Sequence, residues 1–448
     1  MSRRHKAASL IDKLFPLIKE ITAAPFRIVS SPGKTLKSIF SISLYRNAIY
    51  LLSSTIVLSL TGFLFWIVAA RFYSTESVGL ASAAIAAMGL LAALSTLGLD
   101  FAIIGFWHNA GEKSRDMINS CMTVIVLASI TVSIIFVVGL NFWSPALLTI
   151  REHPPFLFLF VMTVVATAAM TLNRQVFVAQ RKAAFTLVQG LVFGLLRFVP
   201  LVLLATYFET FGIFSSWGIA VLLAVVIGVL ILIPRVESSY YPRPIVRKNL
   251  IKDMVGFSFT NYSAQIATVL PQFVLPLLVV NLVGEKQNAY FYICWAIGNI
   301  LFMIPTSVSM SLFAEGSHDK TKLKQEVKQC FKLIAYILGP AVLLLLLFGG
   351  KLLLLFGKPY SENGTHLLWV LALSAIPVSV NYIYFSMKRV EMQMRSVVLL
   401  SWIIAIATLI MSYFLLPHMG ITWVGVAWLS INAIVAALIS REFFKNPV

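Results

Sequence analysis

The sequence predicts an all-α integral membrane protein in which about twelve transmembrane helices form two bundles of six. Its 448 residues are 59% hydrophobic and 12% charged, with a mean hydropathy of +0.90. This composition leaves too little polar surface to cover a water-soluble globule. Apolar stretches long enough to cross a bilayer recur along the whole chain. Basic residues concentrate in alternate connections between these stretches, as the orientation rule for membrane helices requires.

A helix needs ~20 apolar residues to cross the hydrocarbon, and twelve stretches meet this requirement. They are roughly residues 47–70, 78–106, 117–140, 156–178, 184–206, 211–234, 254–283, 289–314, 329–349, 365–387, 396–416 and 420–440. With a cytoplasmic N-terminus, the external loops contain only Arg71, Arg151, Lys286, Lys351 and Lys358 of the 35 lysines and arginines. We therefore expect a multi-pass protein of the cytoplasmic membrane with both termini in the cytoplasm.

The same topology explains the net charge of +18, because the basic residues lie between hydrophobic runs and form no water-facing surface suited to nucleic acid. Cys121, Cys294 and Cys330 show no metal-type spacing, and the six histidines lie in loops, tails or at helix ends. The sequence therefore predicts no metal site, no cofactor and no nucleic-acid partner. The external loops are short and lack clustered carboxylates, so no catalytic residue is predicted.

Residues 1–45 form a basic segment that precedes the first span. The stretch LIDKLFPLIKEI at 10–21 places leucines and isoleucines on one helical face and charged residues on the other, which is typical of a helix lying on anionic lipid. Pro16 interrupts this helix, so a loosely ordered basic tail remains an alternative. SPGKT at 31–35 is similar to the end of a phosphate-binding loop, but Ile28 occupies the position of the required glycine and no strand precedes it. We predict no ATP binding.

The longest basic interior loop, residues 235–253, follows the sixth span. It divides the chain into an N-terminal bundle at 46–234 and a C-terminal bundle at 254–441, with a cytoplasmic tail at 442–448. Each bundle contains an even number of spans, so both enter the membrane in the same orientation. They would then be related by a pseudo-two-fold axis along the membrane normal, with a substrate bound between them.

Traces of a repeat support this division. FGIFSSWGIAV at 211–221 and MGITWVGVAW at 419–428 each end the last external loop of a half, and both combine Gly-Ile, a short insert and a second Gly. The basic turn AQRKAAF at 179–185 precedes the fifth span as MKRVEMQMR at 387–395 precedes the eleventh.

Polar residues form stripes on three spans, and the stripe on the seventh is the longest. Its steps of three and four residues place the members on one helical face, while Pro271 and Pro276 free backbone carbonyls beside it. The stripes consist of Ser258, Asn261, Gln265, Thr268 and Gln272 on the seventh span, of Thr163, Thr167, Thr171, Arg174 and Gln175 on the fourth, and of Asn47, Ser54 and Thr61 on the first. Hydrogen-bonded packing between helices is an alternative for each stripe, whereas three stripes on different helices favour a polar, substrate-binding cavity.

Arg197 lies near the middle of the fifth span, in LVFGLLRFVPLVLLA. A cation at the bilayer centre costs between ~3 and more than ~10 kcal/mol, depending on its access to water. We predict that Arg197 attracts an anionic substrate group in a water-filled central cavity. A salt bridge to Asp100 and an outward-reaching side chain are the alternatives. The stretch GLVFG, with Gly190 and Gly194, suits either close packing or an open chamber.

Two other charged residues lie within the spans. Arg174 is a second candidate for substrate binding, although its position near the cytoplasmic turn also suits an interface anchor. Asp100 is the only acid within an apolar span, and exchange of a proton or sodium ion at its carboxyl is a candidate mechanism of ion coupling.

Four stretches carry a family resemblance. They are AARFYSTESVGLASAAIA at 69–86, LSTLGLDFAIIGF at 94–106, FGKPYSENGTHLLWVLALSAIPVSVNYIYFSMKR at 356–389 and LLPHMGITWVGVAW at 415–428. Over residues 45–440 the chain resembles the polysaccharide biosynthesis flippases that export lipid-linked oligosaccharides. These belong to the multidrug/oligosaccharidyl-lipid/polysaccharide exporter superfamily, which also contains multidrug and toxin extrusion transporters.

The resemblance implies a V-shaped, alternating-access transporter. Such a protein moves a polyprenyl-pyrophosphate-linked oligosaccharide from the cytoplasmic to the outer leaflet, with a cationic cavity for the pyrophosphate and sugars. Its partners would be the lipid-linked glycan, membrane lipid, the glycan-synthesis machinery and a coupling ion, H⁺ or Na⁺. Gly105 stands where relatives commonly carry a basic residue, so a charge contact there is not expected.

Two alternatives remain from the sequence. A multidrug or small-cation exporter of the same superfamily should present core carboxylates, whereas this core contains two arginines and one aspartate. A membrane glycosyltransferase or polymerase should have larger outer loops with clustered acids. The flippase interpretation is favoured over both.

Overall fold

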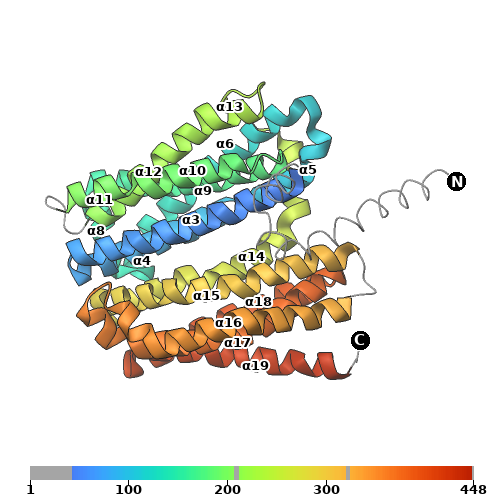
Figure 1. Ribbon diagram of the computed structural model, residues 1–448. Coiled ribbons are helices and arrows are strands. Elements are labelled where there is room, and N and C mark those ends of the chain that lie inside the picture. Colours follow the sequence, from blue (N-terminus) through green and yellow to red (C-terminus); the bar gives the residue numbers. More distant parts are fainter. Residues whose placement is uncertain (1–42, 206–210, 319–322, 446–448) are drawn as a thin grey trace, which may run out of the picture.

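The computed structural model describes residues 43–205, 211–318 and 323–445 (Figure 1). Every element assigned within these ranges is a helix, and twelve helices are long and apolar enough to cross a membrane. The predicted all-α class and the number of spans are confirmed, and the chain is a multi-pass membrane protein. The predicted interfacial helix and the SPGKT stretch lie outside the described residues.

The first half of the chain forms six spans, three of which are interrupted. The uninterrupted spans are α3 (Ser43–Phe72), α6 (Ser114–Val138) and α9 (Pro154–Ala179). The interrupted spans are α4 (Thr75–Ser95) with α5 (Leu99–Ala110), α10 (Ala184–Leu196) with α11 (Phe198–Leu204), and α12 (Gly212–Ile227) with the π-helix η3 (Gly228–Leu232) and α13 (Ile233–Val236). Short helices fill two connections, namely η1 (Gly111–Lys113), α7 (Leu140–Trp143), η2 (Pro145–Leu147) and α8 (Thr149–Glu152).

The second half forms six longer helices. They are α14 (Lys248–Val283), α15 (Glu285–His318), α16 (Leu323–Leu353), α17 (Lys358–Val390), α18 (Met394–Met419) and α19 (Thr422–Lys445). The helix α14 begins ahead of the seventh span predicted from residue 254, so the last six residues of the predicted linker form its first turns.

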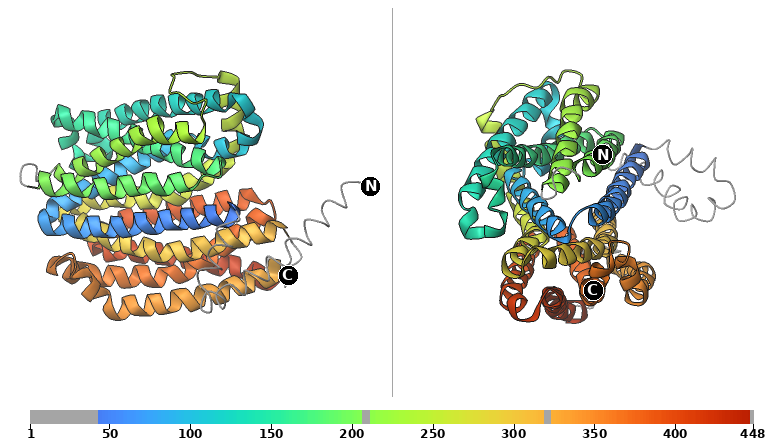
Figure 2. Two further views of the ribbon diagram at one scale, coloured as in Figure 1. Left: turned by 45° about the horizontal axis from the view of Figure 1, so that its top comes forward. Right: turned by 90° about the vertical axis from the view of Figure 1, so that its left-hand side faces the viewer.

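The helices group into two lobes that follow the order of the sequence. In the N-lobe, α3 packs against α10, and α9 packs against α6 and α12. In the C-lobe, α17 packs against α15, α16 and α19, and α14 packs against α18. Figure 2 shows the blue helices α3 and α4 between the rest of the N-lobe and the orange and red helices of the C-lobe. The helix α4 packs against both α14 and α15 and forms most of the contact between the lobes.

The break between α4 and α5 allows α14 to approach closely. Gly98 has φ +76°, a conformation that glycine adopts at little cost. A Cβ atom at this position would lie 2.7 Å from Ser258 Oγ and 2.9 Å from Tyr262 Cβ, both on α14. The glycine therefore serves both the turn of the chain and the packing of the two lobes.

The break between α10 and α11 has a proline as its cause. Pro200 lacks a backbone N–H, so it cannot bond the carbonyl of Leu196, and its ring clashes with that carbonyl in a regular helix. The helix α10 ends at Leu196, and Arg197 separates it from α11. The sequence LLRFVP thus places a helix interruption at the buried arginine.

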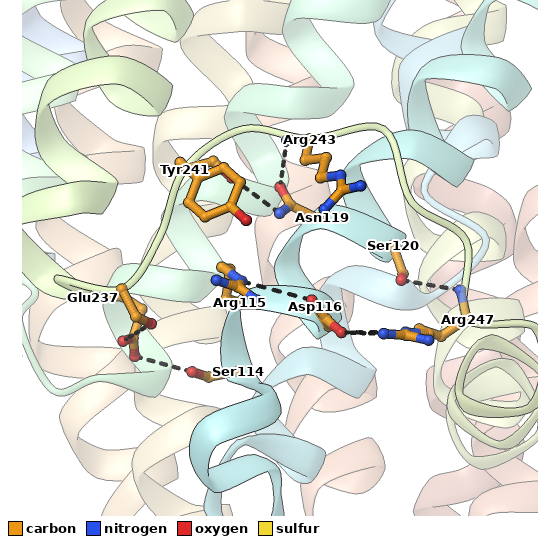
Figure 3. Close-up of polar contacts among 10 residues, drawn as sticks. Ser114, Arg115, Asp116, Asn119, Ser120, Glu237, Tyr241, Arg243 and Arg247 are labelled. Carbon is orange, nitrogen blue, oxygen red and sulfur yellow. Dashed lines mark hydrogen bonds and ion pairs between the residues drawn. The ribbon is translucent and has the colours of Figure 1, made fainter.

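The connection between the lobes lies across the start of α6 (Figure 3). Asn119 donates to the carbonyl of Tyr241 at 3.0 Å and accepts from the amide of Arg243 at 3.2 Å. Arg247 forms an ion pair with Asp116, with 2.7 Å between Nη2 and Oδ2. These contacts hold the linker to the N-lobe. The chain leaves the N-lobe at the start of α14.

The opposite end of the molecule has a set of polar contacts between the lobes, which we call the far-end seam. Lys286 of α15 forms an ion pair with Glu76 of α4 at 2.8 Å. Asn288 of α15 donates to the carbonyl of Gly79 at 2.8 Å and to Ser82 Oγ at 3.0 Å. These contacts join the lobes where the linker is absent.

Candidate functional site

A cavity of about 470 Å³ lies between the lobes. Its walls come from α3 and α4 of the N-lobe and from α14, α15, α17, α19 and the connection between α16 and α17 in the C-lobe. Aromatic rings form much of its surface, namely Phe63, Trp66, Phe273, Tyr292, Trp295, Phe302, Phe356, Tyr382 and Trp428. The volume is within the usual range of small-molecule sites, ~300–1,000 Å³.

The polar groups of the cavity come mainly from the C-lobe. Thr268 and Gln272, from the predicted stripe on α14, line the wall together with Asn299 and Thr306 of α15. Both stripe residues are exposed, whereas Ser258, at the start of the same stripe, is buried against the other lobe. Only one end of the stripe therefore faces the cavity.

Arg197 is enclosed by aromatic rings. Its guanidinium carbon lies 5.0 Å from the ring centre of Phe65, 4.9 Å from that of Phe193 and 4.9 Å from that of Trp217. Its Nη2 donates to Thr61 Oγ1 at 3.0 Å. Cation–π contacts are worth about 2 kcal/mol each when desolvated, so the three rings offset part of the cost of burying the cation.

The burial of Arg197 excludes two of the alternatives that the sequence left open. Its side chain is 1% exposed, so it does not reach outward to water. Among the described residues it forms no ion pair, with Asp100 or with any other acid. Because aromatic rings do not neutralise a cation, Arg197 remains a source of positive potential.

Arg197 lies directly behind the cavity wall and is not itself part of its lining. Gly62 of α3 lines the cavity, and a Cβ atom there would lie 3.7 Å from Arg197 Nη2. Tyr292, which also lines the cavity, lies near enough for an electrostatic interaction with the guanidinium. The sequence led us to expect Arg197 directly in a water-filled chamber. In the structure it lies behind the wall, with Gly62 between the guanidinium and the cavity.

The stretch GLVFG packs closely and does not form an open chamber. A Cβ atom on Gly194 would lie 2.8 Å from Thr61 Oγ1, and one on Gly190 would lie 3.2 Å from Ser54 Oγ. Small residues at this spacing let two membrane helices approach. The approach of α10 to α3 brings Arg197 to the back of the cavity.

The structure does not bring the other predicted binding residues to this cavity. Asn47 accepts a hydrogen bond from the amide of Ala183 at 3.0 Å and so caps the start of α10. Thr167 and Thr171 donate to carbonyls of their own helix. The remaining three, none of them in the lining, are Arg174 and Asn261, which are exposed, and Gln265, which is half-buried.

Asp100 lies in the first turn of α5, directly after the break at Gly98. Its side chain is 1% exposed, and its Oδ1 has no hydrogen-bond partner among the described residues. Nearby, Tyr262 of α14 donates to the carbonyl of Leu94 at 2.8 Å. The carboxyl is therefore buried close to the contact between the lobes.

Several parts of the site were not predicted from the sequence. The prominent omissions are Gly62, Asn299 and the aromatic residues of α15 and α19. Arg389 was also missed: it was assigned to a basic turn, but it is half-buried and lies on α17 two turns after the cavity residue Tyr382. Tryptophans and tyrosines within the spans, away from the interfacial belts where such residues usually gather, were the available signal.

The described residues contain no group of three or more histidine, cysteine or acidic side chains arranged for a metal ion. Cys121 and Cys294 are buried among apolar residues. The site offers aromatic surface, hydrogen-bonding side chains and the positive potential of a caged arginine.

Among the described residues, twelve candidate spans in two lobes with a cavity between them define a multi-pass membrane protein. Residues 44–314 match the family model described as polysaccharide biosynthesis protein. The chain belongs to this family. A search of curated proteins gives no match.

Solved structures share the fold at low sequence identity. The lipid II flippase MurJ in an inward closed conformation has a TM-score of 0.69 at 12% identity, over 88% of this chain and 87% of that one. A multidrug resistance MATE family transporter of the MOP superfamily, in an inward-facing conformation, has a TM-score of 0.65 at 15% identity, over 88% and 96%. A MOP superfamily transporter from Pyrococcus furiosus has a TM-score of 0.54 at 13% identity, over 88% and 93%.

Proposed function

We propose that this protein is a flippase that moves a polyprenyl-pyrophosphate-linked oligosaccharide across the cytoplasmic membrane for cell-surface polysaccharide biosynthesis. The observation that carries this proposal is the caged, unneutralised Arg197 behind a cavity rich in aromatic rings. Positive potential suits the pyrophosphate. Aromatic faces suit the apolar C–H faces of sugar rings.

The proposed transport is noncovalent and needs no catalytic residue. The cavity replaces the water around the headgroup by polar and aromatic contacts, while the polyprenyl tail stays in lipid beside α3, whose residues Ile56, Leu60 and Leu64 are exposed. The lobes would then separate at the far-end seam and close at the end of the molecule where the linker lies. This movement would carry the headgroup across the membrane. In this proposal residues 46–234 and 254–441 move as two bodies, and both termini lie in the cytoplasm.

The residues predicted to bind substrate divide into those that line the cavity and those that do not. Thr268 and Gln272 bind the headgroup directly, since both line the cavity. Asn47, Thr167, Thr171, Arg174, Asn261 and Gln265 would reach a substrate only in another arrangement of the lobes. Asp100 is the proposed site of coupling to H⁺ or Na⁺, because a buried carboxyl with an unpartnered oxygen lies at the lobe contact.

Membership of the polysaccharide biosynthesis family favours a flippase over a multidrug or small-cation exporter. It also supports partners from the glycan-synthesis machinery. A membrane glycosyltransferase or polymerase is the third candidate, and glycan transfer by the purified protein would establish it instead.

The test is reconstitution of the purified protein in vesicles that contain a fluorescent polyprenyl-pyrophosphate sugar. Exposure of the label on either leaflet is followed with a membrane-impermeant quencher. We expect exchange between leaflets at a rate well above that of protein-free vesicles. Accumulation of an organic cation with no exchange of the lipid would replace the flippase by the exporter.

A further inference from the structure

Gly62 of α3 lies between the cavity and the guanidinium of Arg197. It lines the cavity and has no side chain. Within the described part of the chain, and apart from neighbouring residues of α3, Arg197 Nη2 is the one atom within 4 Å of the position that its Cβ would occupy. No other side chain therefore lies between Gly62 and the guanidinium.

The guanidinium is buried behind Gly62 and keeps its charge, with no ion pair among the described residues. Three rings surround it, and the one hydrogen bond described, from Nη2 to Thr61, uses a single N–H of a group that has five. Its Nε has no partner among the described residues. Rings and a hydroxyl fix the position of the cation without neutralising it, in contrast to a carboxylate.

We propose that Gly62 is a window through which the positive potential of Arg197 attracts the phosphate oxygens of an anionic headgroup in the cavity. The size of the side chain at position 62 would then decide whether the cavity accepts anions. Gly62 would thus be a specificity-determining residue for the function proposed above, on which this inference rests. The shared chemistry is a pyrophosphate, either free or attached to a polyprenyl chain.

The experiment measures binding of inorganic pyrophosphate to the full-length protein in detergent by isothermal titration calorimetry. The variants are Gly62→Leu, Gly62→Ala and Arg197→Met. Gly339→Leu is the matched control, since Gly339 is an exposed glycine of α16 with no other atoms within 4 Å of its Cβ position. Melting temperature and size-exclusion profile report whether each variant is folded.

We expect the Gly62→Leu and Arg197→Met variants to lose affinity about tenfold or more, because the first moves the phosphate away from the positive charge and the second removes that charge. The Gly62→Ala variant should lose a smaller part of the affinity, because a methyl group at 3.7 Å is in ordinary contact with the guanidinium and covers only part of the window. The Gly339→Leu control should bind as the wild type does.

The possible failures are distinguishable. Normal binding by a folded Gly62→Leu variant, together with weak binding by Arg197→Met, overturns the window and leaves the proposed function intact. Equal binding by the wild type and Arg197→Met overturns the role of Arg197 in both. If the leucine variant does not fold, the alanine variant decides, since an affinity equal to that of the wild type contradicts the window.

A second arm replaces inorganic pyrophosphate by a short-chain polyprenyl pyrophosphate. Tighter binding of the lipid form, lost in the Gly62→Leu variant, assigns the site to a lipid headgroup. Equal affinity for both forms in the wild type assigns it to free pyrophosphate and contradicts the proposed lipid substrate while leaving the window in place.

Discussion

Among the described residues of the N-lobe, Arg197 and Asp100 are the buried charged side chains, and the regions around them differ in what each side chain faces. In the wall between α3 and α10, Arg197 is surrounded by three aromatic rings and lies behind the cavity. At the break between α4 and α5, Asp100 lies beside α14 of the other lobe, with one oxygen unpartnered. The two do not form an ion pair with each other.

The difference teaches what each charge is suited to do. A cation held by rings keeps its field and can attract an anion without leaving its place. A buried carboxyl at a contact between two lobes has a different consequence, because gaining or losing its charge changes the free energy of that contact. One region is therefore suited to substrate binding and the other to coupling of lobe movement to an ion. The following changes test this division.

Removal of the charge at position 197 is expected to have the largest effect. Arg197→Ala should abolish surface glycan in cells that depend on this protein, with the amount of protein in the membrane unchanged. Arg197→Met, which keeps much of the volume without the charge, should also be inactive. Arg197→Lys should be partly active, because lysine keeps the charge but lacks the planar fork of donors. Normal glycan in the alanine variant would remove Arg197 from the site.

Asp100→Asn is expected to rank second. The amide keeps the shape of the side chain but cannot bind and release a proton, so the response of leaflet exchange to a proton or sodium gradient should weaken in vesicles. We expect a loss of about tenfold in gradient-driven transport, within the usual range of coupling free energies between sites. Pyrophosphate affinity should stay near that of the wild type.

Asp253→Asn is the control for this variant, since Asp253 is exposed near the start of α14. A gradient response that persists in the Asp100→Asn variant contradicts the proposed coupling site. A loss of pyrophosphate affinity in the same variant would show that Asp100 also affects substrate binding, and would contradict the separate roles of the two regions.

A paired substitution compares the hydrogen bonds of the two regions. Thr61→Val removes the acceptor of Arg197 Nη2, a bond to a charged group worth about 1.5–3 kcal/mol. Tyr262→Phe removes a neutral bond to the carbonyl of Leu94, worth about 1 kcal/mol. We expect pyrophosphate affinity to fall severalfold in the first variant only. The second should instead lower the melting temperature slightly, as a lobe contact would.

The sequence alone predicts those features of the fold that depend on local pattern. Hydrophobic length and the distribution of basic residues predict twelve spans in two groups, because each follows from a single stretch of chain. The burial of Arg197 is predictable for the same reason. The position of Pro200 three residues later also predicts a helix interruption, although the sequence analysis did not use it.

The surroundings of each charge depend on neighbours that are distant in sequence. The rings around Arg197 come from α3, α10 and α12, and the opening at Gly62 exists only because α10 packs on α3. Periodicity places Thr268 and Ser258 on one face, but it cannot indicate that Ser258 meets Gly98 while Thr268 meets the cavity. Side-chain partners between helices are set by the relative rotation and register of the helices, which no single helix encodes.

Arg174→Ala is expected to have the smallest effect, and it tests whether burial rather than charge alone distinguishes Arg197. Arg174 is exposed near the end of α9 and lies outside the cavity lining. Its long side chain can reach the headgroup region, where a single arginine contributes about 1 kcal/mol of attraction to anionic lipid. We therefore expect leaflet exchange to change by less than about twofold in vesicles, and Arg174→Lys to match the wild type. If Arg174→Ala abolished exchange as Arg197→Ala is expected to do, an exposed arginine outside the cavity lining would also be essential for transport. Burial behind the cavity would then not distinguish the role of Arg197.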